Sequence, residues 1–139
     1  MTTVSVLFVC RENANCSQMA EAFAHMHGQG VIDAASAGSA PAPSVNPRAV
    51  AAMSERGYDL SGAVPKGLDS VGPGPWDYLI TMGCGDECPW VAAVSRGDWD
   101  LPDPKNMSPE DIAAVRDEIE SRVIDLIDRV RGAGAVSSP

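Results

Sequence analysis

The segment Val4–Val9 is short, rich in β-branched residues and apolar on both of its faces. Such a run is typical of a strand that is buried on both sides of a sheet, as the strands of parallel sheets are. A polar turn follows it, and apolar residues then recur at helical spacing from Met19 until Gly28. His25 and His27 on this expected helix are interpreted as surface residues without a partner. A buried strand that leads through a turn into a helix places the chain in the α/β class.

The rest of the chain continues this alternation. Strands are expected over residues 31–36 and 76–82, and helices over residues 47–56 and 108–132. The glycine- and proline-rich segment 62–75 is expected to be irregular, and the tail 133–139 is expected to be frayed. We therefore predict a single α/β domain over residues 1–139, with a parallel sheet that carries helices on both faces.

Charge and hydropathy exclude several classes of partner. The chain has 10 Lys and Arg against 19 Asp and Glu, a net charge of −9 and no basic cluster, which argues against nucleic acid and anionic membranes. Its longest apolar run, residues 4–10, is far shorter than the roughly 20 residues of a membrane span. The first residues show neither a basic leader region nor a cleavage pattern, so we expect a cytoplasmic protein.

Four cysteines occur as two close pairs, Cys10 with Cys16 and Cys84 with Cys88. In a chain without an export signal, such cysteines favour catalytic, redox or metal-binding roles over structural disulfides. Cys10 stands where the first strand ends and a helix is about to begin, which is where α/β folds place their ligands. Backbone amides and the helix dipole there would favour a thiolate and attract an oxyanion, with Ser17 as a further donor. We therefore predict that Cys10 is a nucleophile, the alternative being an inert cysteine that closes the strand.

Residues Val9–Ala22 resemble the phosphate-binding loop of thiol-dependent arsenate reductases, which share the fold of the low-molecular-weight protein tyrosine phosphatases. The family pattern is Cys-x5-Arg-Ser-Gln-Met-Ala-Glu. Further similarity at Ser36–Gly38, Asn46–Val50, Thr81–Pro89 and Trp99–Pro104 extends the resemblance over nearly the whole chain. It implies a four-stranded parallel sheet with helices on both faces. It also implies arsenate reduction by an external thiol, thioredoxin or a low-molecular-weight thiol, with no tightly bound cofactor.

The resemblance implies a separate role for each thiol of a relay. Cys10 would attack arsenate, Cys84 would attack the covalent adduct and release arsenite, and Cys88 would take over the disulfide. Asp103, between two prolines, matches the general acid that protonates the leaving oxygen. The external thiol would then reduce the disulfide.

The loop that follows Cys10 is expected to bind the oxyanion. Its members are Arg11, Glu12, Asn13, Ala14, Asn15, Cys16 and Ser17. By resemblance, Asn13, Glu21 and Ser36 hold this loop in shape, in some family members around a monovalent cation.

One residue departs from the family pattern, because Cys16 stands where the family has the arginine that closes the loop. A guanidinium holds two oxygens of an oxyanion in a bidentate fork and neutralises charge in the transition state. Loss of such a contact ordinarily costs about 2–5 kcal/mol. Arg11 either binds the anion in place of the missing arginine or is a solvated side chain. Cys16 either leaves the loop without that anion contact or is a reactive thiol that forms a disulfide with Cys10. The sequence leaves these alternatives open.

Two other functions are compatible with these residues. A phosphomonoester (protein tyrosine) phosphatase would use Cys10 and Asp103 and would not require the second pair of cysteines. A non-catalytic protein with a degenerate loop would bind arsenite, or a metal ion such as zinc, through its thiols.

Overall fold

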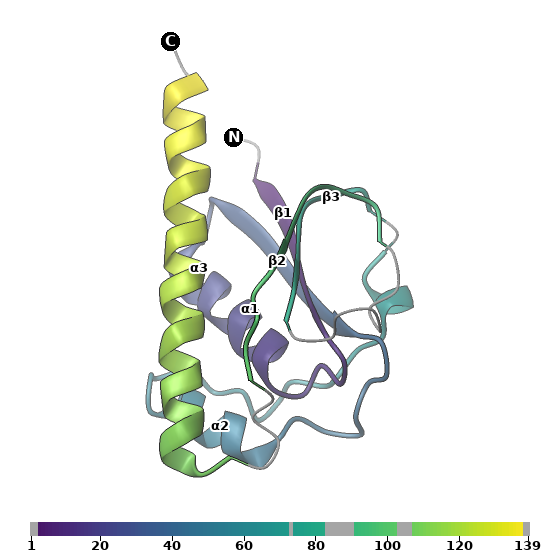
Figure 1. Cartoon of the computed structure of the whole chain (residues 1–139), viewed down its shortest axis with the longest axis vertical. Coiled ribbons are helices and arrows are strands. Elements are labelled where there is room, and N and C mark those ends of the chain that lie inside the picture. Colours follow the sequence, from purple (N-terminus) through teal and green to yellow (C-terminus); the bar gives the residue numbers. More distant parts are fainter. Residues whose placement is uncertain (1–2, 73, 83–90, 103–106, 138–139) are drawn as a thin grey trace.

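The structure is a computed structural model that describes residues 3–72, 74–82, 91–102 and 107–137 (Figure 1). The elements in chain order are β1 (Val4–Cys10), α1 (Cys16–His27), β2 (Ile32–Gly38), α2 (Pro47–Ser54), the 3-10 turn η1 (Leu68–Ser70), β3 (Trp76–Thr81), β4 (Ala93–Asp98) and α3 (Pro109–Ser137). Strands and helices therefore alternate in the first half of the chain, as the sequence predicts.

The four strands form one sheet in the order β2-β1-β3-β4, and every neighbouring pair is parallel. The predicted four-stranded parallel sheet is confirmed. β1 is an inner strand, and its register pairs Val4 with Ile32 and Cys10 with Gly38. The carboxyl ends of β1 and β2 thus lie side by side, and the loop after Cys10 begins at the edge where parallel sheets bind ligands.

Side chains of β1 alternate between two apolar layers. Val6 and Phe8 belong to the layer that includes α1 and α3, which pack side by side over this face of the sheet (Figure 1). Leu7 and Val9 face the other layer, where residues of η1 and its flanks, together with Trp76, cover the sheet. Both faces of β1 are therefore buried, which explains its apolar sequence.

The structure differs from the sequence prediction at two elements of the second half. β4 was not located from the sequence, because its residues are mostly exposed and Val94 is 77% accessible, as suits an edge strand. The residues 133–137, which were expected to be frayed, continue α3 as far as Ser137. Gly132 does not have a positive φ, so it does not act as the left-handed cap that ends many helices.

Glu120 on α3 connects three helical segments. Its carboxylate accepts hydrogen bonds from Arg56, which follows α2, and from His27 Nε2 at 2.8 Å on α1. His25 Nε2 lies 3.7 Å from a carboxylate oxygen of Glu21. His25 lies at the surface, as predicted, although it has a neighbouring carboxylate on its own helix. For His27 the interpretation as a residue without a partner is wrong, because the folded chain brings Glu120 of α3 against the end of α1.

No helix in the described part of the chain combines the length and the apolar character that a membrane crossing requires.

Candidate active site

Cys10 is the last residue of β1, and its thiol is held by two hydrogen-bonding groups. The backbone N–H of Asn13 donates to Cys10 Sγ at 3.1 Å, and Ser17 Oγ lies 2.9 Å from the same sulfur. Cys10 is 8% exposed, so these contacts are shielded from bulk water. Donors aimed at a sulfur stabilise its negative charge, which is the form that acts as a nucleophile.

Four backbone carbonyl groups of the loop between β1 and α1 point outward, toward the segment 39–46. The carbonyl oxygens of Cys10, Arg11, Glu12 and Ala14 accept hydrogen bonds from the N–H groups of Ser39, Ala40, Ala42 and Asn46, respectively. In a trans peptide the N–H points opposite to the C=O, so the N–H groups of residues 11, 12, 13 and 15 face the inner side of the loop. There the N–H of Asn13 meets the Cys10 sulfur. Successive inward amides at the start of a helix form a concavity suited to an anion.

The buried side chain of Asn13 stabilises this loop through hydrogen bonds. Asn13 is fully buried and has a φ of 52°, a left-handed conformation that asparagine tolerates better than most residues. Its Nδ2 donates to Ser17 Oγ at 2.8 Å, and its Oδ1 accepts from Gln18 Nε2 at 3.0 Å and from the N–H of Lys66 at 2.8 Å. One side chain therefore joins the loop, the first turn of α1 and the distant segment at Lys66.

Gly38 allows the loop to lie close to β2. A Cβ at this position would lie 2.6 Å from the carbonyl oxygen of Arg11 and 2.9 Å from the backbone nitrogen of Asn13. Both contacts are with backbone atoms, which cannot move aside as the end of a side chain can. Only glycine fits here without displacing the loop.

Cys16 begins α1 and is 5% exposed, in the same apolar cluster as Cys10. Its neighbour Asn15 is also buried, and no described residue offers a hydrogen bond to its Oδ1. Arg11, in contrast, lies at the surface. The loop thus has a buried thiol where the family pattern has a guanidinium, with an exposed arginine next to Cys10.

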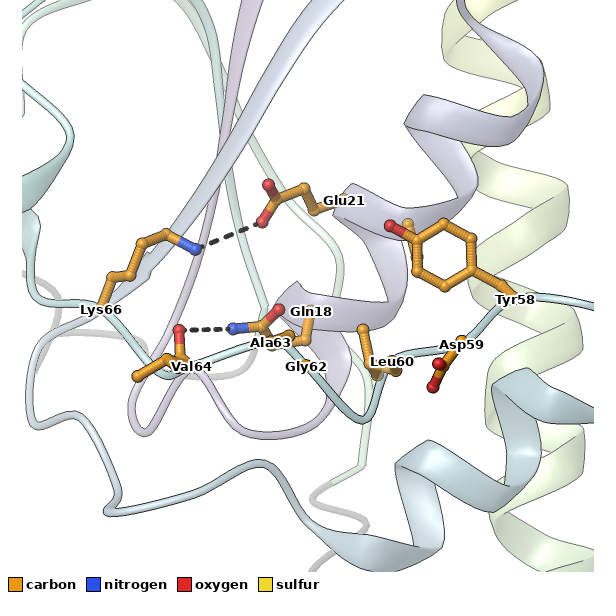
Figure 2. A pocket seen from close by; sticks show the side chains of 10 residues that line it. Gln18, Glu21, Tyr58, Asp59, Leu60, Gly62, Ala63, Val64 and Lys66 are labelled. Carbon is orange, nitrogen blue, oxygen red and sulfur yellow. Dashed lines mark hydrogen bonds and ion pairs between the residues drawn. The ribbon is translucent and has the colours of Figure 1, made fainter.

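Glu21, Ser36 and Lys66 form a polar cluster behind the loop, and Figure 2 shows the side chains of Glu21 and Lys66 directed toward each other. Ser36 Oγ donates to Glu21 Oε1 at 2.5 Å, and Lys66 Nζ lies 3.6 Å from the same oxygen. Lys66 was missed in the sequence, because it is far along the chain from both the loop and Glu21. Asn13 Oδ1 already accepts two donors and Glu21 already has a cationic partner, so these residues do not fit the monovalent cation that the resemblance implies.

Cys84, Cys88 and Asp103 lie outside the described residues. Met82, the last described residue before Cys84, lies beside β1, where its N–H donates to the carbonyl of Val9 at 2.8 Å. Trp99, which follows β4, packs against Phe8 of β1 with ring centroids 5.7 Å apart. Within residues 3–72, 74–82, 91–102 and 107–137, no three His, Cys, Asp or Glu side chains are grouped as a metal site.

Comparison with known proteins shows one consistent relationship. Residues 5–135 match the model of the family described as low molecular weight phosphotyrosine protein phosphatase. The glutaredoxin arsenate reductase of Synechocystis sp. is 38% identical over 128 residues, which are 90% of this chain and 97% of that protein.

Solved structures of arsenate reductases are also similar. One, an arsenate reductase in the phosphate binding state, has a TM-score of 0.84 and 37% identity, covering 92% of this chain and 99% of that one. The thioredoxin-dependent arsenate reductase Cg_ArsC1' of Corynebacterium glutamicum has a TM-score of 0.77 and 33% identity, covering 96% of this chain and 64% of that one.

Proposed function

The chain belongs to the low molecular weight phosphotyrosine protein phosphatase family, and from that premise we propose that it reduces arsenate to arsenite with electrons from an external thiol. The observation that carries the proposal is the position of Cys10 Sγ, which accepts from the Asn13 N–H in a loop of inward amides. A thiolate next to a tetrahedral anion site is arranged for attack on the central atom of that anion. The similar proteins named arsenate reductases support arsenate as this anion.

The first step is nucleophilic substitution at arsenic. The Cys10 thiolate forms an S–As bond, and one As–O bond breaks. The departing oxygen leaves as water when it receives a proton, for which we propose the carboxylic acid of Asp103. The inward amides of the loop would stabilise the charge on the remaining oxygens.

The second step transfers two electrons. Cys84 attacks the Cys10 sulfur, the electron pair of the S–As bond passes to arsenic, and arsenite leaves with a Cys10–Cys84 disulfide behind it. Cys88 then attacks Cys84, which frees Cys10 and leaves a Cys84–Cys88 disulfide. Arsenate and two thiols thus give arsenite, one disulfide and one water. Reduction of the disulfide by a thioredoxin- or glutaredoxin-type thiol closes the cycle, in keeping with the names of two similar proteins.

A single-turnover experiment on the fully reduced protein tests this proposal. The protein is mixed with arsenate and quenched with an alkylating reagent, and the unalkylated cysteines are located by mass spectrometry while arsenite is counted. One arsenite per chain with a disulfide between Cys84 and Cys88, or between Cys10 and Cys84, is the expected result. A disulfide between Cys10 and Cys16 formed only with arsenate would place Cys16 in the relay instead. Four free thiols and tight binding of arsenite would overturn reduction in favour of a thiol-binding protein.

Phosphatase activity is the second candidate, and the family description favours it. It would use Cys10 and Asp103 alone. The double variant Cys84→Ser/Cys88→Ser is the matched test, because it should abolish arsenate turnover and leave hydrolysis of an aryl phosphate unchanged. Cys10→Ser should abolish both reactions, which controls for an unrelated contaminant.

A further inference from the structure

Lys66 lies between the loop and a cleft of about 420 Å³, which is lined in part by Gln18, Glu21 and Tyr58 (Figure 2). Its backbone N–H donates to Asn13 Oδ1 at 2.8 Å, while its Nζ lies 3.6 Å from Glu21 Oε1. We propose that the Lys66 ammonium is a built-in counter-cation, which positions Glu21 and the loop so that the protein needs no bound monovalent cation there. Lys66 acts in this proposal as a positioning residue that does not touch the oxyanion.

Glu21 connects α1 to the sheet at the level of the loop. Its Oε1 accepts from Ser36 Oγ on β2, and Ser36 pairs with Phe8 on β1. Gln18, one turn earlier on α1, donates to both Asn13 Oδ1 and the carbonyl of Val64. A change in the position of Glu21 would therefore be passed to the first turn of α1, where Ser17 contacts the Cys10 sulfur.

The Glu21 carboxylate requires a nearby positive charge. Its side chain is only 18% exposed, and a buried carboxylate is costly unless it is paired. Ser36 supplies a hydrogen bond but no charge, and His25, at 3.7 Å from Oε2, is charged only when protonated. Burial and the Glu21 charge raise the pKa of Tyr58, so its hydroxyl is neutral at pH 7. Among the described side chains around Glu21, Lys66 thus provides the permanent charge.

The cleft makes this proposal testable with simple salts. Lys66 and Glu21 both line the cleft, and the Lys66 side chain is 34% exposed, so its removal would leave space beside Glu21 that solvent can reach. A potassium ion could then enter and replace the missing charge. A tetramethylammonium ion is too large and too weakly coordinating to do so, although it screens charge equally at the same ionic strength.

The experiment compares wild type, Lys66→Met and Lys66→Arg in about 100 mM potassium chloride and in tetramethylammonium chloride at equal ionic strength. Thermal unfolding and the affinity for inorganic phosphate are measured in both salts. Arg122→Met, which removes one charge from an exposed pair on α3, is the matched control.

We expect wild type, Lys66→Arg and the control each to have the same melting temperature and the same phosphate affinity in both salts. For Lys66→Met in tetramethylammonium, we expect a melting temperature lower by about 3 °C and phosphate binding weaker by about five-fold, both recovered with potassium. A wild-type protein that gains stability or phosphate affinity from potassium would overturn the proposal. So would a Lys66→Met variant that is weakened equally in both salts or that behaves like Arg122→Met.

The phosphate measurement rests on the proposed anion-binding loop, but the melting measurement does not. Recovery of the Lys66→Met melting temperature by potassium, with no phosphate bound by any variant, would support the counter-cation and contradict the proposed function. Arsenate turnover by wild type, with no effect of cations on the melting temperature of Lys66→Met, would support the proposed function and contradict the counter-cation.

Discussion

The amide N–H of Asn13 donates to the sulfur of Cys10 at 3.1 Å, from a residue whose own backbone is left-handed. The carbonyl of Glu12, in the same peptide group, accepts from the N–H of Ala42, which leaves the Asn13 N–H pointing inward. The side chain of Asn13 holds the turn in place through Ser17, Gln18 and Lys66. The geometry at the thiol therefore depends on a residue three positions further along the chain. This relationship makes Asn13 the first residue to test.

Asn13→Ala should lower the free energy of unfolding by about 2–4 kcal/mol, because it removes the three hydrogen bonds of the Asn13 side chain and because alanine tolerates the left-handed region less well than asparagine. Asn13→Gly should lose the same hydrogen bonds without the backbone strain and be more stable than the alanine variant by about 1 kcal/mol. Urea unfolding measures both. Equal stability of the two variants would mean that the left-handed turn relaxes when the side chain is lost.

Gly38→Ala should destabilise the protein by about 2 kcal/mol or more and weaken phosphate binding, since the new methyl group meets the backbone of Arg11. Gly132→Ala is the control, because nothing lies within 4 Å of a Cβ at that helical position. It should stabilise the protein by about 0.5–1 kcal/mol. A fully stable Gly38→Ala variant that binds phosphate normally would contradict the close approach of the loop to β2.

The contribution of Glu120 to stability should depend on pH. Burial alone would raise the pKa of Glu120, but hydrogen bonds from Arg56 and His27, together with their charges, outweigh it and leave the pKa below its usual 4.5. A lowered pKa in the folded state means that the stabilisation is complete above pH 4.5 and is lost as the pH falls through the folded-state value. Glu120→Gln should therefore be less stable than wild type by about 1–3 kcal/mol at pH 7, with the difference shrinking toward pH 3.

Urea unfolding from pH 3 to pH 7 measures this difference. Glu118→Gln, which breaks an exposed pair with Arg122, is the control and should change stability by less than about 1 kcal/mol at every pH. A difference between Glu120→Gln and wild type that stays constant with pH would show that the carboxylate charge is not responsible.

Cys16→Arg should raise kcat/KM for arsenate by about ten-fold or more, because a guanidinium at the start of α1 would restore the bidentate contact with two anion oxygens. Steady-state kinetics with excess reductant measure it, with Cys16→Ser as the control that removes the thiol without adding charge. A fall in turnover in both variants would show instead that Cys16 is a working thiol. A fall in turnover in the Cys16→Arg variant alone would indicate that Arg11 already binds the anion.

The fold was largely predictable because its main elements are encoded locally. The apolar run Val4–Val9 indicated a strand buried on both faces, and the spacing of apolar residues after Pro109 indicated the long helix α3. β4 could not be recognised, since an exposed edge strand has no apolar pattern of its own. The sequence predicts the end of α3 at Gly132, because glycine often follows the last residue of a helix, but the helix continues through it to Ser137.

The α/β class, the position of Cys10 at the end of a strand and the presence of Ser17 in the same loop follow from the sequence alone, because these features depend on residues close together in the chain. Other contacts are visible only in the folded chain: Lys66 contacts both Asn13 and Glu21, Gly38 lies against the backbone of the loop, and His27 contacts Glu120. These contacts join segments that are far apart in sequence. They form when parallel strands and packed helices bring those segments together, and no local pattern of residue types records that geometry.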